Sequence, residues 1–362
     1  MTAMLQRDHR HFVLSRVDTI GDVVLILPMA RILKRAFPGC KVSLLVRRYT
    51  SPIGQYCEHV DAVHAWDEIE RAPEGEQIRQ FKSLNADVII HIHPKPAIAW
   101  RAKQARIPVR IGTARRLYHW LTCNRLVYLR RFRSPLHEAQ LNLKLLKGLG
   151  VRASYDLDEL RAYFGLTAHC DLPQRLQSLV DPGRLNLIVH PGSNGTSREW
   201  PPEHFAALIE RLPTERFNVM ITGSLKERER FADCLPMKLP HVRDLMGALS
   251  LSKLIVLIAR VDGLVAASTG PLHIAAAAGK HVLGIYSPLR AKRSSRWGPL
   301  GINACVFQLD KDCAACRNSR DCACMRDITP QQVCDHLLSL TIRRDAQERS
   351  VGVPPAQGVF TA

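Results

Sequence analysis

Short apolar runs alternate with longer amphipathic stretches along the first half of the chain. The run FVLS begins at Phe12, and residues 23–36 follow it with the spacing of an amphipathic helix. The segments between the apolar runs are long enough to form crossover helices. The pattern therefore predicts a parallel sheet, with further strands at residues 41–46, near 60, 87–92 and 107–112.

The second half of the chain repeats this alternation after a helical pattern over residues 135–149. Two tandem α/β domains predict ligand sites beyond the carboxyl ends of their strands. The expected strands lie at residues 185–190, 217–223, 262–268 and 281–288. The expected division is an N-terminal domain of residues 1–165, a linker of 166–183, a C-terminal domain of 184–342 and a disordered tail of 343–362.

The composition is that of a globular protein with a large excess of positive charge. The 362 residues include 51 Lys and Arg against 33 Asp and Glu, for a formal net charge of +18. The length suits two domains of ordinary size, and a hydrophobic share of 46% excludes a disordered or fibrous chain. The charge predicts an anionic partner.

No run of about 18 uncharged apolar residues is present, so we expect no membrane-spanning helix. The first residues lack the apolar core of a secretory signal, which favours a cytoplasmic protein. In that compartment, most of the eleven cysteines are expected to be reduced thiols rather than a disulfide framework.

The end of the first strand carries the first candidate for chemistry. It lacks the GxGxxG pattern of dinucleotide-binding dehydrogenases, which disfavours a Rossmann oxidoreductase. Gly21 allows a close backbone approach there, and Asp22 lies in the first turn of the next helix. Asp22 is either a helix cap or a general base that faces a ligand.

Two segments of the second half are candidates for phosphate binding. Residues 192–195 form a Gly/Ser/Asn loop after a strand, and Arg198 follows them with a fixed positive charge. Backbone N–H groups and a guanidinium suit a diphosphate, although such a loop can also be a simple turn. Residues 268–270 end another strand before a helix that begins near Pro271 and has His273 in its first turn.

Together these segments resemble glycosyltransferase family 9, the ADP-heptose:lipopolysaccharide heptosyltransferases. The resemblance extends from about residue 12 to 340. It implies a GT-B fold, an α/β architecture in which two Rossmann-like domains with parallel sheets face each other across a cleft. The matching segments, in the family's order and approximate spacing, are residues 20–46, 190–209, 221–229, 244–254 and 268–279.

The resemblance also implies a role for individual residues. Asp22 matches the family's proposed catalytic base. Because a helix N-terminus stabilises an ionised carboxylate, such a base would accept the proton late in the reaction. Ser268 stands where many relatives have Asp, which leaves the donor sugar open. The other matching positions are Ser193, Asn194 and Arg198 on the diphosphate, Thr269, Gly270 and His273 on its second side, and Leu249 on the adenine.

The implied reaction is an inverting, metal-independent transfer of a heptose from ADP-heptose to the lipopolysaccharide inner core. No cofactor is required, because the ADP-sugar is the donor substrate. The implied partners are that nucleotide-sugar, a glycolipid acceptor and the anionic inner face of the cytoplasmic membrane. Two alternatives stay open: a family member with another nucleotide-sugar, and a non-catalytic basic protein that binds an anionic glycan or nucleic acid.

Residues 100–132 contain many arginines and no Asp or Glu. Aromatic side chains lie among them, which suits a membrane interface, an anionic glycolipid or, less well, a nucleic acid, for which no binding motif is present. A solvated basic surface is the alternative. The residues expected to face the acceptor or a membrane are Arg115, Arg116, Arg125 and Arg130.

Four cysteines near the C-terminus, Cys313, Cys316, Cys322 and Cys324, are dense enough for a structural zinc site. A reduced or partly disulfide-bridged loop that fastens the end of the second domain is the alternative, and no catalytic metal is expected. His91 and His93 alternate on a predicted strand and so are expected to share one face. We expect them to line the acceptor side or merely to pack there, rather than to bind a metal.

Overall fold

Two parallel sheets flanked by helices form the described part of the chain. The computed structural model describes residues 10–132, 134–168, 173–311, 313, 315, 323–340 and the backbone of 359–360. The chain divides into two compact units, residues 1–167 and 168–362, and each is described by itself. The expected tail lies outside the described residues except for the backbone of Val359–Phe360.

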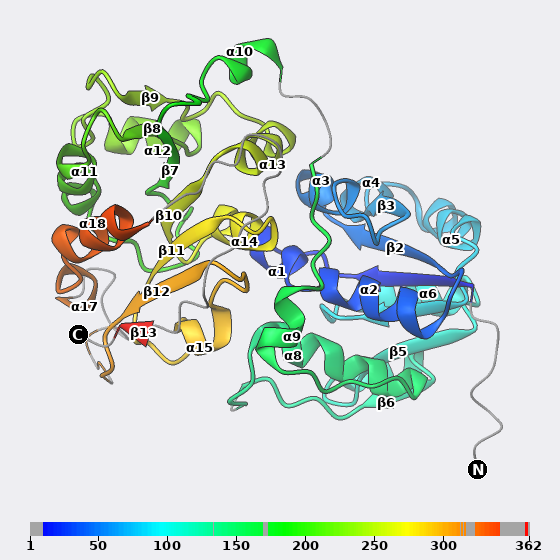
Figure 1. The fold of residues 1–362 in the computed structure, drawn as a ribbon. Coiled ribbons are helices and arrows are strands. Elements are labelled where there is room, and N and C mark those ends of the chain that lie inside the picture. The colour runs from blue at the N-terminus through cyan, green and yellow to red at the C-terminus, as the bar shows by residue number, and fades with distance from the viewer. Residues whose placement is uncertain are drawn as a thin grey trace. The chain divides into compact units, whose positions relative to one another are not determined.

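Unit 1 contains a six-stranded sheet in the order β3-β2-β1-β4-β5-β6, and every pair of neighbours is parallel (Figure 1). All five residues of β1 are buried, which is the burial expected for a central strand covered on both faces. The strands are β1 (His11–Ser15), β2 (Lys41–Val46), β3 (Ala62–Ala65), β4 (Val88–His91), β5 (Val109–Thr113) and β6 (Arg125–Val127).

The helix predicted over residues 23–36 is two helices in the structure. Pro28 occupies the first turn of the second one, where its missing N–H costs no helical hydrogen bond. The α-helices of unit 1 are α1 (Ile20–Val24), α2 (Leu27–Ala36), α3 (Ser51–Gln55), α4 (Trp66–Ile69), α5 (Glu74–Ser83), α6 (Pro96–Gln104), α7 (Leu117–Thr122), α8 (Glu138–Leu143) and α9 (Leu157–Arg161). The 3₁₀ helices are η1 (Arg48–Thr50) and η2 (Lys144–Leu149), so the helix predicted over 135–149 is α8 followed by η2.

Unit 2 contains a parallel sheet in the order β13-β12-β11-β10-β7-β8-β9. The strands are β7 (Leu185–His190), β8 (Phe217–Ile221), β9 (Val242–Asp244), β10 (Gly263–Ala267), β11 (His281–Tyr286), β12 (Ala304–Gln308) and β13 (Val359–Phe360). The helices are α10 (Gln174–Gln177), α11 (Pro202–Arg211), α12 (Leu225–Phe231), α13 (Leu251–Arg260), α14 (Gly270–Ala277), α15 (Ser294–Trp297), α17 (Ala323–Arg326) and α18 (Pro330–Ser339). The predicted α/β fold with two parallel Rossmann-like sheets is confirmed.

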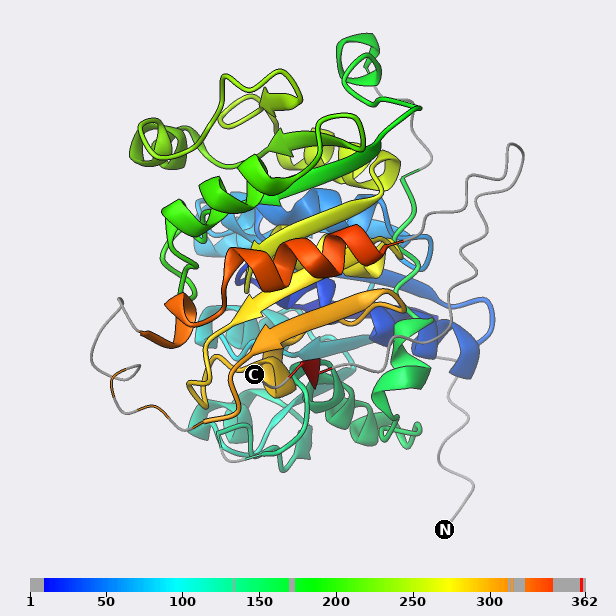
Figure 2. The ribbon, with the colours of Figure 1, turned by 60° about the vertical axis from the view of Figure 1, so that its left-hand side comes forward.

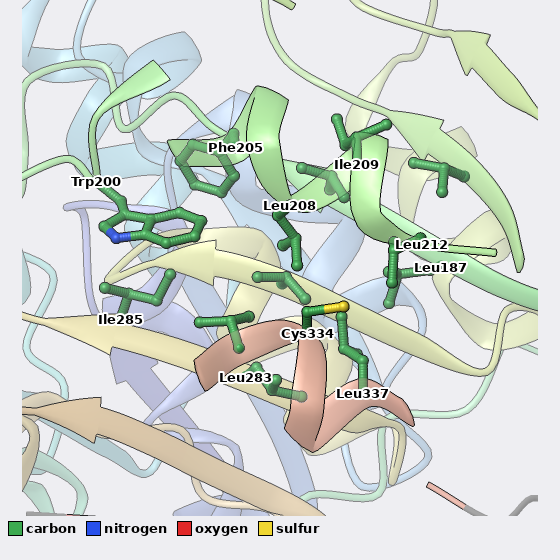
Figure 3. Close-up of a cluster of buried hydrophobic side chains, with 14 of the residues drawn as sticks. Leu187, Trp200, Phe205, Leu208, Ile209, Leu212, Leu283, Ile285, Cys334 and Leu337 are labelled. Carbon is green, nitrogen blue, oxygen red and sulfur yellow. The ribbon is translucent and has the colours of Figure 1, made fainter. Parts of the chain in front are cut away.

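The core of unit 2 lies where α11 and α18 cover one face of its sheet. Figure 2 shows these two helices next to each other. In Figure 3, side chains from the α11 side, such as Phe205 and Leu208, point toward Cys334 and Leu337 of α18. Leu283 of β11 lies below them in the same buried cluster. The last described helix of the chain therefore completes the core that supports the carboxyl ends of the strands.

Both sheets reverse their strand order beside their first strand. In unit 1, β1 lies between β2 and β4, and in unit 2, β7 lies between β8 and β10. At such a reversal, the connections leave in opposite directions and open a space beyond the carboxyl ends of the two central strands, where α/β proteins bind ligands. The fold therefore directs attention to the loops after β1 and β4, and to those after β7 and β10.

Candidate functional site

The reversal point of unit 2 brings together the two predicted phosphate segments. Strands β7 and β10 are paired in parallel, from Leu187 beside Gly263 to His190 beside Ala266. The loop after β7 contains Ser193, and the loop after β10 contains Thr269. The two segments are more than 70 residues apart in the sequence, and the sheet places them on adjacent strand ends.

Two acids, the buried Glu227 and the half-buried Glu199, fix the loop after β7. Asn194 has a positive φ of 49°, and its backbone N–H donates to Glu227 Oε1 at 3.0 Å. A Cβ on Gly192 would lie 2.0 Å from the same oxygen, so any other residue would require this carboxylate or the loop to shift. Burial alone would raise the pKa of Glu227, but hydrogen bonds from Ser224 and Asn194 outweigh it and lower that pKa. Glu227 is therefore an ionised anchor for the loop.

The second acid, Glu199, binds Ser193. The backbone N–H and the hydroxyl of Ser193 each donate to Glu199 Oε1 at 2.8 Å, and Ser193 is buried. Glu199 in turn pairs with Arg230 at 2.8 Å. The Ser193 hydroxyl is thus engaged within the loop, whereas the Asn194 side chain is exposed and Arg198 is half-buried.

A second cation reaches this loop from another strand end. Lys292 follows β11, and its Nζ donates to the backbone carbonyl of Thr196. The loop after β7 therefore has Arg198 in its own sequence and the exposed Lys292 beside it. Two cations at one loop suit a ligand that carries more than one negative charge.

Thr269 caps helix α14 beside this loop. It is the N-cap residue, Gly270 and Pro271 follow it, and His273 is buried in the first turn. The Thr269 hydroxyl is buried and has no hydrogen-bond partner among the described residues. A buried hydroxyl without a partner is costly, so an oxygen of a bound ligand would satisfy it.

Ser268 lies between β10 and the N-cap residue Thr269. It hydrogen-bonds the phenol of Tyr286, which also donates to the carbonyl of Trp297 at 2.7 Å. Burial raises the pKa of Tyr286, which keeps the phenol protonated. The half-buried Ser268 is therefore hydrogen-bonded to the fully buried phenol of Tyr286.

Leu249 lies on the loop after β9, at the outer side of the same edge. It is half-buried and directly precedes Ser250, the N-cap of α13. Gly247 donates its N–H to the carbonyl of Gly223 at 2.8 Å, which joins this loop to the one after β8. Leu249 thus offers apolar surface on the same side of the sheet as the phosphate segments.

In unit 1, Asp22 lies at the reversal point as the third residue of α1. Its Oδ2 accepts hydrogen bonds from the Thr19 hydroxyl at 2.6 Å and from the Thr19 N–H at 3.4 Å. The two residues form a capping box. The cap is thus present, and because Asp22 retains some exposure, it does not exclude contact with a ligand.

Arg16, at the end of β1, connects Asp22 to other acids. Its buried guanidinium pairs with Asp22, with Asp18 at 2.9 Å and with Glu138 at 3.4 Å. Burial would lower the pKa of Arg16, but the three carboxylates raise it overall, led by Asp22. Arg131 also pairs with Glu138, so two arginines and three carboxylates form one network.

The structure separates the two histidines that were expected to share a face. Strand β4 ends at His91, which is fully buried and packs against His119 with ring centroids 5.6 Å apart. Burial lowers the pKa of His91 to about 3. His93 lies beyond the strand, partly exposed, with Nδ1 2.8 Å from Asp18 Oδ2. Only His93 therefore lies at the reversal point.

The basic stretch divides into engaged and exposed side chains. Arg125 is half-buried and donates to the Gly148 carbonyl at 2.8 Å. Arg101 pairs with Glu74, and Arg131 with Glu138, so acids distant in the sequence neutralise part of the run without any external anion. Arg115, Arg116 and Arg130 are exposed.

The cysteine cluster is only partly described. Cys316 and Cys322 lie outside the described residues, whereas Cys313 and Cys324 pack with the core of unit 2. In the described ranges, no group of three His, Cys, Asp or Glu side chains is arranged to hold a metal ion.

Several residues of these sites were not identified from the sequence. Glu227 follows Ser224 in an S-x-x-E capping box, a signal that the sequence does contain. Arg16, Asp18, Glu199 and Lys292 carry no such local signal, because no sequence motif marks the side chains that they contact. Their roles depend on contacts that only the fold brings about.

Comparison with known proteins agrees with this arrangement. A family model described as glycosyltransferase family 9 (heptosyltransferase) matches residues 76–324. Lipopolysaccharide heptosyltransferase 2 of Salmonella typhimurium is 25% identical over 358 residues, covering 89% of this chain and 95% of that protein.

Solved structures share the fold. The structure of E. coli ADP-heptose lps heptosyltransferase II matches with a TM-score of 0.70 and 20% identity over 91% of this chain and 98% of that one. E. coli heptosyltransferase WaaC with ADP matches with a TM-score of 0.67 and 17% identity over 91% and 99%. None of the helices in the described residues has the length and apolar character needed to span a membrane.

Proposed function

The chain belongs to glycosyltransferase family 9, and we propose that it transfers a heptose from ADP-heptose to the inner core of lipopolysaccharide. The observation that carries the proposal is the convergence of two phosphate segments at the reversal point of unit 2, with an unsatisfied hydroxyl on Thr269. Unit 2 corresponds to the nucleotide-sugar domain in this proposal, and unit 1 to the acceptor domain.

The donor diphosphate binds between the loop after β7 and the N-terminus of α14. Asn194 and Arg198 contact it from the loop, Thr269 donates its hydroxyl, and Gly270 offers a backbone N–H. Ser193 acts through the backbone that it fixes against Glu199. His273 lines the second side, and Leu249 packs on the adenine.

Asp22 acts as the base in unit 1. The acceptor hydroxyl oxygen forms a bond to the anomeric carbon as the bond from that carbon to the ADP oxygen breaks, so the configuration inverts. The hydroxyl proton passes to Asp22, and the leaving electron pair stays on ADP. Arg16 and Thr19 bind the carboxylate and hold it in place, and the proton is transferred as the carbon–oxygen bond forms.

The charge of the leaving diphosphate is met by protein cations. Arg198, Lys292 and the N-terminus of α14 lie at the strand ends where a metal would otherwise be needed. We therefore propose that transfer requires no metal and no cofactor. A structural zinc at the cysteine cluster, which includes Cys316 and Cys322 outside the described residues, would be independent of the transfer reaction. Elemental analysis of the purified protein tests for it.

One observation keeps a second donor open. The Ser268 hydroxyl binds Tyr286, so this position lacks the carboxylate with which many relatives can bind sugar hydroxyls. A family member that uses another nucleotide-sugar is the alternative. The acceptor is a glycolipid in either case, which places the enzyme at the inner face of the cytoplasmic membrane.

Calorimetric titration with ADP, GDP and UDP tests the donor site. We expect ADP to bind in the micromolar range, about −8 kcal/mol, and the other two much more weakly. Thr269→Val removes the hydroxyl at nearly constant volume and should weaken ADP about tenfold. Thr214→Val, at an exposed loop, is the matched control and should bind like wild type. If no nucleotide binds, the chain is better treated as a basic binding protein.

A further inference from the structure

Exposed apolar side chains gather on one short helix of unit 1. On α7, Leu117, Trp120 and Leu121 are 88%, 63% and 63% exposed. Their spacing of three and four residues places them on one face of the helix. Tyr128, just beyond β6, is also exposed. Burying apolar side chains is a main source of folding stability, so a cluster left in water indicates a contact surface.

The opposite face of α7 fixes the helix in this orientation. His119 and Thr122 are buried, and His119 Nδ1 lies 3.0 Å from the Thr113 carbonyl. Gly112 makes room for this packing, since a Cβ there would lie 2.5 Å from His119 Nδ1. The apolar face therefore cannot turn inward without breaking the packing of His119.

Positive charge surrounds this face. Lys103 donates to the Leu121 carbonyl at 2.8 Å and lies 5.2 Å from the ring centre of Trp100. Arg115 donates to the Tyr128 hydroxyl at 3.2 Å, and Arg116 is exposed. Since residues 100–132 contain no acid, nothing in this segment neutralises these cations. We define the α7 surface as the exposed surface formed by Arg115, Arg116, Leu117, Trp120, Leu121 and Tyr128.

We propose that the α7 surface docks on an anionic lipid bilayer, with Leu117, Trp120 and Leu121 below the headgroups and the arginines at their level. Trp and Tyr are suited to this boundary because each has an apolar body and a polar tip. The arginines match the negative charge of such a membrane. Arg125 takes no part, because it binds the Gly148 carbonyl. Membrane docking depends on the proposed function only for its biological reason, which is access to a glycolipid acceptor.

Sedimentation with vesicles of phosphatidylglycerol and phosphatidylethanolamine tests the proposal without any substrate. Wild type should bind these vesicles and bind phosphatidylcholine vesicles far less. Leu117→Ser with Leu121→Ser should lower the partition coefficient at least about tenfold, the change that 1.4 kcal/mol produces. Ile302→Ser, at an apolar residue of unit 2 that is 59% exposed, should change nothing. Equal loss in both variants, or none in either, overturns the proposal.

The charge contribution has its own pair of variants. Arg115→Ala with Arg116→Ala should weaken binding to the anionic vesicles about tenfold or more and reduce its salt dependence. Lys82→Ala with Lys238→Ala removes two charges from exposed positions elsewhere and should have little effect. If both pairs lose affinity equally, net charge rather than the α7 surface determines binding.

Depth is measured with brominated lipids, which quench nearby tryptophans. Quenching of tryptophan fluorescence should fall in Trp120→Phe. It should persist in Trp297→Phe, because Trp297 lies in unit 2. A dimer in the absence of lipid that dissociates in the Leu117→Ser, Leu121→Ser variant would assign the surface to a second copy instead. If these variants keep full transfer to a water-soluble acceptor, the proposed function stands apart from the docking result.

Discussion

The guanidinium of Arg16 pairs with the carboxylate of Asp22, and the same buried group pairs with Asp18. Asp18 in turn binds His93 Nδ1 at 2.8 Å. One arginine at the end of β1 therefore orients the proposed base and, through Asp18, a histidine after β4. The network therefore fixes side chains that follow both central strands at the reversal point of unit 1.

Asp22→Asn should lower kcat by about 10²–10⁴-fold, because the amide cannot accept the acceptor proton. ADP affinity should stay at the wild-type level, since the donor site lies in unit 2. Thr19→Ala is the control, because it removes the hydroxyl from the cap and leaves the carboxylate. It should cost about 1 kcal/mol of stability with a much smaller loss of kcat. Equal kinetic losses would show that Asp22 acts only as a cap.

Arg16→Met should destabilise the fold by about 3–5 kcal/mol, because it leaves carboxylates at a buried site without their cation. Arg16→Lys should cost less, since the ammonium keeps the positive charge but lacks the planar array of N–H donors that contacts several carboxylates at once. Urea unfolding measures both. A Met variant as stable as wild type would contradict the network.

Gly192→Ala should weaken ADP binding by at least about tenfold, because the new Cβ would collide with Glu227 Oε1 and displace the loop that carries Asn194. Gly75→Ala is the matched control, since a Cβ there meets only Arg79 Nη1 at 4.0 Å. The control should bind ADP normally, and its helical position favours alanine. Calorimetry with both variants decides whether Glu227 fixes the loop.

His91→Leu should reduce the loss of stability on acidification. The folded-state pKa of His91 is lowered to about 3 by burial, so below pH 6.5 the unfolded chain takes up a proton that the folded chain excludes. This lowers the free energy of unfolding as the pH falls, by about 2 kcal/mol between pH 7 and 5. Urea unfolding at both pH values should show a smaller drop in the variant. An unchanged drop would show that His91 does not contribute.

The fold was predictable where apolar runs were long. The runs at β1, β2, β7 and β11 each gave a strand close to its observed bounds. Strands β6 and β9 have three residues each, too few for a periodic signal, and were not predicted. The segment expected to be a linker contains α10, a helix of one turn, for the same reason.

The candidate site was predictable only in part. Asn194, Arg198 and Thr269 could be identified because they follow apolar runs in small polar segments. Glu199 and Lys292 could not, since their contacts with Ser193 and Thr196 depend on loop conformation. His91 and His93 were expected on one face, but β4 ends between them, so one is buried in the core and the other faces the site.

The central claim is heptosyl transfer, and a direct assay of product tests it. Purified protein is incubated with ADP-heptose and a heptose-deficient lipopolysaccharide acceptor. EDTA is present to remove divalent metals, and the mass of the acceptor is measured by mass spectrometry. The account predicts one added heptose per acceptor and stoichiometric release of ADP by the wild type, and almost none by Asp22→Asn. An acceptor of unchanged mass, while ADP still binds, would contradict ADP-heptose as the donor and favour another nucleotide-sugar.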